Sequence, residues 1–177
     1  MANGIMWLEA NANNGLTDPC TSRHLAALLQ GITKKPILFR HAHAPNEMAY
    51  HLRRAKAKSW PVVYITAHGE PGRMLLDRWT RLDELARILG PSLQGRALHC
   101  SSCLLMKNRK AAEAFRVATG LRLLSGFAEV VPWIDCSAFE LMLMELLTFM
   151  RKPFLLRRSI QRTMPSLAKQ LAWVMLG

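Results

Sequence analysis

One histidine and one cysteine in this sequence stand where they could act on the same substrate. His68 comes directly after the β-branched and aromatic run at residues 61–66, and Cys103 follows the apolar run at residues 95–100. Both runs are typical of buried strands. Because neighbouring parallel strands end at one edge of a sheet, we expect the imidazole and the thiol to come within reach of one another.

An imidazole beside a thiol supports nucleophilic chemistry. A thiol is mostly protonated at neutral pH, and a base that accepts its proton produces the thiolate that attacks a carbonyl carbon. Gly69 lets the backbone approach the reacting group, and its N–H, with that of Cys103, would stabilise an oxyanion. The pattern therefore predicts acyl transfer, with Cys103 as nucleophile and His68 as general base and acid.

The other segments alternate between expected strands and expected helices. Strands are expected at residues 4–9, 36–40, 61–66 and 95–100, with a short hairpin at 73–77. Residues 121–131 are expected to supply a fifth strand and the loop that follows it. Helices are expected at residues 23–30, 45–58, 80–89, 110–119 and 133–149. Their start signals are Thr21 or Ser22, Pro45 and Thr80, and their stop signals are Gly31 and Gly120. This order predicts a three-layer α/β fold, with a mostly parallel central sheet and helices on both faces.

Length and composition are those of an ordinary globular protein. The chain has 177 residues, of which 50% are hydrophobic and 20% are charged. We expect one domain at residues 1–150, with residues 151–177 as a basic helical segment packed on it. The sequence shows neither an apolar run of membrane-spanning length nor the features of a secretory signal. We therefore expect a cytoplasmic protein without membrane contact and with reduced cysteines.

Positive charge is concentrated in the last segment. The formal net charge is +12, and no Asp or Glu follows Glu145. Apolar residues between the basic ones predict an amphipathic helix with a solvated basic face, and the alternative is a docking surface for an acidic protein, a nucleotide signal or a polyanion. No base-reading motif supports nucleic-acid binding as the main function.

The two strand ends also resemble those of a known family. A strand ending in His68-Gly69, followed about 35 residues later by a strand ending in Ser101-Ser102-Cys103, is similar to caspases, metacaspases and CHAT-type peptidases (clan CD). Their nucleophile follows a strand in motifs such as Gln-Ala-Cys or Ser-Ala-Cys. The element order is similar across residues 4–149, and the chain looks like a small stand-alone bacterial member of this superfamily.

This resemblance implies a cysteine endopeptidase that cleaves protein or peptide substrates and needs no cofactor. It also implies an effector in bacterial stress or antiphage systems, activated by a partner protein or a nucleotide signal. Leu104 and Leu105 stand where caspases carry Arg-Gly, so neither a caspase specificity pocket nor an autoprocessing linker is implied.

The resemblance further implies which residues contact substrate. Such peptidases place pocket residues after the first and fifth strands, which here are Glu9, Glu129, Trp133 and Asp135. A carboxylate at Glu9 would favour a basic side chain at P1, the substrate residue before the cleaved bond. The alternatives are a solvated loop acid at Glu9 and a packing role for Trp133.

Two other functions remain open. A catalytically silent module of this fold could bind a partner through its basic end. Cys100 and Cys103 also have the spacing of a metal or redox half-site, with His99 adjacent. A zinc site needs a second ligand pair, however, and neither Cys20 nor Cys136 has a close Cys or His partner. We therefore predict no metal, and we expect Cys100 and Cys136 to pack in the core.

Overall fold

The computed structural model describes residues 4–10 and 22–177. Within them, six strands form the central sheet in the order β2-β1-β3-β7-β8-β9. The strands are β1 (Ile5–Glu9), β2 (Ile37–His41), β3 (Val62–Thr66), β7 (Ala97–Ser101), β8 (Leu123–Phe127) and β9 (Trp173–Leu176). The first five run parallel, and β9 lies antiparallel to β8. The expected α/β class with a mostly parallel sheet is confirmed.

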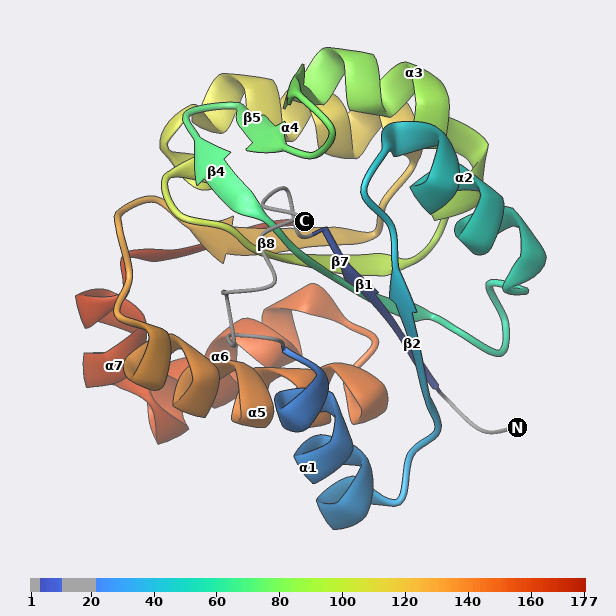
Figure 1. The fold of residues 1–177 in the computed structure, drawn as a ribbon. Coiled ribbons are helices and arrows are strands. Elements are labelled where there is room, and N and C mark those ends of the chain that lie inside the picture. The colour runs from blue at the N-terminus through green and yellow to red at the C-terminus, as the bar shows by residue number, and fades with distance from the viewer. Residues whose placement is uncertain (1–3, 11–21) are drawn as a thin grey trace.

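Helices cover both faces of this sheet (Figure 1). One face carries α2 (Pro45–Arg54), α3 (Leu82–Leu93) and α4 (Arg109–Thr119). The other carries α1 (Arg23–Thr33), α5 (Trp133–Phe149), α6 (Pro153–Thr163) and α7 (Pro165–Gln170). A short 3-10 helix, η1 (Leu105–Lys107), follows β7. No helix in the described ranges combines the length and the apolar character needed to cross a membrane.

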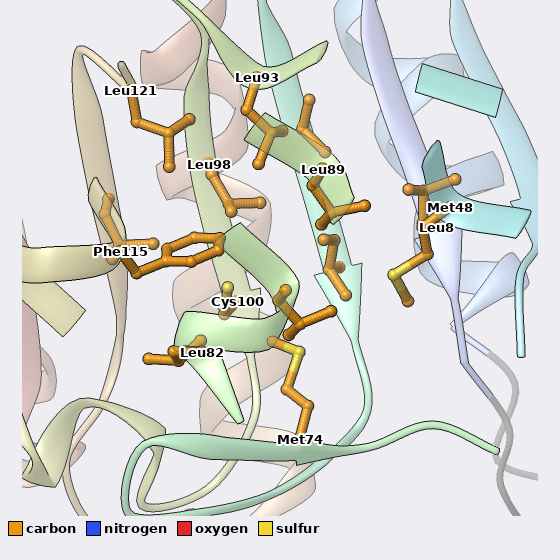
Figure 2. Packing of buried hydrophobic residues seen from close by; sticks show 14 of the residues in the cluster. Leu8, Met48, Met74, Leu82, Leu89, Leu93, Leu98, Cys100, Phe115 and Leu121 are labelled. Atoms are coloured by element: carbon orange, nitrogen blue, oxygen red, sulfur yellow. The ribbon is translucent and has the colours of Figure 1, made fainter. Parts of the chain in front are cut away.

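The strands divide their side chains between two cores. Successive strand residues point to opposite faces, so Met6 and Leu8 pack under α2 to α4, whereas Ile5 and Trp7 pack on the other face. Figure 2 shows the first of these cores, where Leu98 of β7 lies near Leu89 and Leu93 of α3 and Phe115 of α4. The alternation matters for function because it decides which strand residues can reach which face.

A second, smaller sheet connects β3 to α3. Its strands β4 (His68–Glu70), β5 (Arg73–Leu75) and β6 (Trp79–Arg81) are antiparallel, so the expected hairpin is part of a three-stranded unit. Thr80 was expected to cap the next helix, but it is buried in β6 and donates its hydroxyl to the Arg78 carbonyl at 3.1 Å. The helix begins at Leu82, and it ends at Leu93 instead of residue 89.

Two other helix ends differ from expectation. Gly31 lies inside α1, and Lys34 ends that helix with a left-handed φ of 56°. Ser22 occupies the expected cap position, but its side chain makes no capping bond; it binds Glu9 instead. Helix α2 ends at Arg54, before the expected residue 58. Gly120 ends α4 as expected, with φ of 65°. Thr21 lies outside the described residues.

The C-terminal segment is helical only in part. Residues 151–177 contain α6 and α7, and then β9, which was expected to be helical and instead extends the central sheet. Backbone pairing with β8 satisfies the strand, and Arg157 donates from Nη2 to the Met175 carbonyl at 3.1 Å. The segment therefore packs on the same sheet as the rest of the chain, while its division from residues 1–150 stays a prediction.

Candidate active site

The sheet register brings three strand ends into one row. Glu9 of β1 lies opposite Thr66 of β3, and Thr66 lies opposite Ser101 of β7. His68 follows Thr66 by two residues and Cys103 follows Ser101 by two. Because the strands are parallel, both residues leave the sheet at its carboxyl edge, which is where binding sites form in open α/β sheets.

A pocket of about 210 Å³ lies at this edge. It brings His68 and Cys103 together with Glu9 of the first strand and Trp133 of α5. The lining residues are Glu9, Ala10, Thr66, Ala67, His68, Ser101, Ser102, Cys103, Val131, Trp133 and Cys136. The two residues expected to carry chemistry therefore share one cavity.

Gly69 lies tightly against the segment that carries Cys103. A Cβ atom at Gly69 would overlap the Cys103 carbonyl oxygen and would lie 2.9 Å from the Ser102 Cβ. Only glycine allows this approach of two backbones. The hairpin that begins at His68 is thereby held against the loop that begins at Cys103.

The described cysteines have different surroundings. Cys100 is buried in the core beneath α3 and α4, near Phe115 and Leu82 (Figure 2), as expected. Cys103 is half-buried and lines the pocket. Burial raises the pKa of the Cys100 thiol, which therefore stays protonated. Cys20 lies outside the described residues.

The Cys-x-x-Cys spacing does not create a paired site here. Cys100 is not among the residues that line the pocket, whereas Cys103 is. Among the described residues, no group of three His, Cys, Asp or Glu side chains could hold a metal ion. Cys136 is buried on the opposite face of the sheet from Cys100, and it contributes to the wall of the pocket.

Glu9 lines the pocket, and its carboxylate is already engaged. Oε2 accepts hydrogen bonds from the Ser22 backbone N–H, at 2.6 Å, and from the Ser22 hydroxyl. Oε1 lies 3.7 Å from Nδ1 of His41. Glu9 is only 4% exposed, so it is not the solvated loop acid that was the alternative. A role in substrate binding stays a prediction.

The three residues expected after the fifth strand are dispersed. Trp133 lines the pocket and is 42% exposed. Glu129 is exposed and lies 3.7 Å from Lys107, between Oε1 and Nζ. Asp135 accepts a hydrogen bond from Gln170 Nε2 at 2.9 Å, and neither acid lines the pocket. Of these three, Trp133 alone is placed to contact a ligand in the cavity.

A buried polar network beneath the pocket was not predicted. Glu140 of α5 is fully buried and accepts a hydrogen bond from the Tyr64 hydroxyl at 2.7 Å. Its other oxygen lies 2.9 Å from His99 Nε2, and His99 Nδ1 lies 3.0 Å from the Ser125 hydroxyl. The network joins α5 to β3, β7 and β8, and the first two of these strands also contribute residues to the pocket.

This network reaches the wall of the pocket through Ser101 and Cys136. The Ser101 hydroxyl interacts with both Tyr64 and Cys136. Burial, and then the Glu140 carboxylate, raise the pKa values of Tyr64 and Cys136. Both groups therefore remain protonated donors beside the carboxylate. A signal was present in the sequence, since Glu140 interrupts an apolar helix face.

Comparison with known proteins gives a structural likeness without a sequence match. No protein-family model matches the chain, and no curated protein sequence matches it. Among solved structures, the crystal structure of caspase-1 from Spodoptera frugiperda is similar, with a TM-score of 0.56 and 12% identity. The match covers 99% of this chain and 86% of the caspase chain. The chain therefore has a caspase-like fold.

Proposed function

We propose that the chain is a cysteine peptidase that uses Cys103 as its nucleophile and His68 as its general base and acid. The observation that carries the proposal is the shared pocket at the carboxyl edge of a caspase-like sheet, which both side chains line. Trp133 forms part of the same wall and supports binding of a substrate side chain.

The first step forms an acyl-enzyme. His68 accepts the proton of the Cys103 thiol, and the thiolate sulfur forms a bond to the carbonyl carbon of the substrate. The carbonyl oxygen becomes an oxyanion, which accepts hydrogen bonds from the backbone N–H groups of Gly69 and Cys103. When the intermediate collapses, the carbon–nitrogen bond breaks and His68 donates its proton to the leaving amine.

The second step releases the product. A water molecule gives a proton to His68 and attacks the thioester carbon. The carbon–sulfur bond breaks, and the sulfur takes the proton back from His68. The carboxylic acid leaves, and the free thiol is restored.

The size of the pocket bears on regulation. Ligand pockets usually measure about 300 to 1,000 Å³, whereas this one measures about 210 Å³. It holds one side chain more readily than a peptide segment. This small volume supports a cleft that opens when a partner protein or a small nucleotide signal binds. The wider role that we propose, a cytoplasmic effector in a bacterial stress or antiphage system, rests on the resemblance of the two strand ends alone.

Variants of the described cysteines test the activity. We expect Cys103→Ala and His68→Ala to abolish cleavage of a peptide library or of co-expressed protein substrates. Cys100→Ala is the matched control, because its buried thiol stays protonated and lies outside the pocket. It should retain most of the activity.

Alkylation by iodoacetamide, mapped by mass spectrometry, separates the peptidase from its rivals. Cys103 should react much faster than Cys100 or Cys136, because burial raises the pKa of both of those thiols. Rapid alkylation without cleavage of any substrate would favour a silent binding module. Equal loss of function in Cys100→Ala and Cys103→Ala would favour a paired-cysteine site instead.

A further inference from the structure

A second, larger hollow lies away from the candidate active site. It is a groove of about 900 Å³ between α3 and α4, on the face of the sheet that also carries the small hairpin (Figure 1). Its floor is made of Leu82 and Phe115 together with small side chains. These small residues are Ala86, Ala111, Ala114 and Ala118. Ala114 and Ala118 are exposed, so the groove opens to solvent.

The rim of the groove is basic. Four cationic side chains line it, against one carboxylate among the described lining residues, Asp83. Arg81 lies 2.9 Å from Asp83, and Arg73 lies 2.9 Å from Glu70. Within residues 4–10 and 22–177, Arg87 and Lys110 have no carboxylate partner, and both are exposed. Two uncompensated charges therefore border an apolar floor.

These properties fit one kind of occupant. Along α4 the lining residues run from Lys110 to Ala118, so the groove is about 12 Å long there and matches about two turns of a helix. Small side chains on the floor let a helix backbone come close, and an amphipathic helix buries one apolar face in such grooves. The basic rim selects acidic flanks. We propose that the groove docks an acidic amphipathic helix of a partner protein.

The groove is also connected to the candidate active site. Gly72, at the groove wall, donates its backbone N–H to the Leu105 carbonyl at 3.2 Å, and its own carbonyl accepts from Leu82 N–H at 3.0 Å. Gly72 follows the strand that starts at His68, and Leu105 follows Cys103 by two residues. A helix pressing on Leu82 and Gly72 would therefore shift both catalytic segments. This coupling rests on the proposed function, whereas the docking does not.

A display library of helical peptides tests the docking. Peptides of about 14 residues, randomised on one face and its flanks, are selected against the intact chain and counter-selected against Ala114→Trp, which fills the groove. We expect selected sequences to carry apolar residues at helical spacing with Glu or Asp beside them. The proposal would be overturned if the selected sequences were basic or non-helical. It would also be overturned if every selected peptide bound Ala114→Trp as well as it binds the wild-type chain.

Matched variants separate the groove from general charge attraction. In fluorescence anisotropy, Arg87→Glu with Lys110→Glu should weaken binding of a selected peptide by about tenfold or more. Two control variants lie on the opposite face of the sheet. Arg158→Glu with Arg162→Glu reverses two exposed charges on α6, and Ala27→Trp adds a tryptophan at an exposed position of α1, as Ala114→Trp does on α4. Neither control should change the affinity. An equal loss in the α6 pair would overturn the proposal.

The coupling has a separate readout. With saturating peptide, the rate of Cys103 alkylation should change several-fold, and the rate of Cys100 should not. Unchanged Cys103 alkylation despite full binding contradicts the coupling and leaves the docking site intact. Tight binding by a chain that never cleaves peptides overturns the proposed activity alone.

Discussion

At the residue scale, Glu9 has a structural role that the sequence did not predict, beside the substrate-binding role that stays a prediction. Its strand position predicted a carboxylate at the rim of the site, and the residue does line the pocket. Its hydrogen bonds to Ser22, however, depend on where α1 begins relative to β1. That relation follows from tertiary packing and not from local pattern. Oε2 of Glu9 is bound by Ser22, and Oε1 lies beside His41.

The first prediction concerns the specificity of this residue. Cleavage should prefer Arg or Lys over Asp at P1, because a carboxylate in a mostly dry pocket strengthens a charge-assisted bond. Glu9→Gln keeps an oxygen that accepts from Ser22 but loses the charge. The Arg to Asp ratio of kcat/KM should fall by about 10- to 100-fold, which corresponds to about 1.5–3 kcal/mol.

Glu129→Gln is the matched control for that experiment. Glu129 is exposed, its partner is Lys107, and it does not line the pocket. Its substitution should leave the ratio unchanged. A preference for acidic P1 residues, or the same ratio in wild type and Glu9→Gln, would remove Glu9 from substrate recognition.

A second residue-scale effect involves the buried network. Glu140 accepts from Tyr64 and lies beside His99, so Glu140→Ala removes the carboxylate partner of two buried polar groups. Removing one member of a buried pair costs about 3–5 kcal/mol in the free energy of unfolding. Urea denaturation at neutral pH should show this loss as a lower midpoint with a similar slope.

Glu145→Ala provides the comparison on the same helix. Glu145 is exposed, so its removal should change the free energy of unfolding by no more than about 0.5 kcal/mol. Similar midpoints for the two variants would show that the network contributes little. The helix pattern identified Glu140 as an interruption, but its partners lie 41 and 76 residues away on strands, which no local spacing reveals.

At the element scale, strand ends were more predictable than helix ends. The β-branched residues of β3 and the flanking Pro61 predicted that strand correctly, because β-branched and aromatic residues favour strands over helices. Gly31 and Gly120 looked alike as stop signals. Gly120 takes a left-handed conformation, whereas α1 continues through Gly31, since a glycine inside a helix costs only about 1 kcal/mol.

Two glycine substitutions should therefore have opposite effects. Gly69→Ala forces the hairpin away from the Cys103 carbonyl, so it should cost about 1–3 kcal/mol in the free energy of unfolding and about 100-fold in peptidase kcat/KM. Gly31→Ala, where nothing lies within 4 Å of the added Cβ, should gain about 0.5–1 kcal/mol by thermal or urea unfolding. Unchanged kcat/KM in Gly69→Ala would show that the close approach does not position the site.

At the scale of the whole molecule, the last segment completes the sheet. The alternation of strands and helices predicted the three layers. The basic residues after Glu145, however, predicted a helical segment through residue 177, so the final strand was missed. Strand β9 has only four residues, and it pairs with β8, whose sequence lies about 50 residues earlier. Short strands whose partners are distant depend on the rest of the fold, so local periodicity does not identify them.

The last prediction tests whether residues 151–177 belong to the same folding unit as the rest. Deleting residues 173–177 removes β9 and exposes the edge of β8. It also removes Val174 and Met175, which are 8% and 7% exposed, and the loss of their buried packing costs about 1.5–3 kcal/mol each. A total of about 3–6 kcal/mol is a large part of the 5–15 kcal/mol that stabilises a typical domain. Circular dichroism should therefore show a chain that is unfolded or marginally folded at 37 °C.

The milder variant Met175→Ala keeps the strand and measures its packing alone. It should lower the free energy of unfolding by about 2–5 kcal/mol, because a buried methionine is replaced by a cavity. Met142→Ala, at a position on α5 that is 43% exposed, should change it by no more than about 0.5 kcal/mol. In each case the unfolding should remain one transition, since β9, α6 and α5 enclose one continuous core. Two separate transitions, or full stability after the deletion, would instead favour a boundary near residue 150 and a C-terminal segment that folds independently of the sheet.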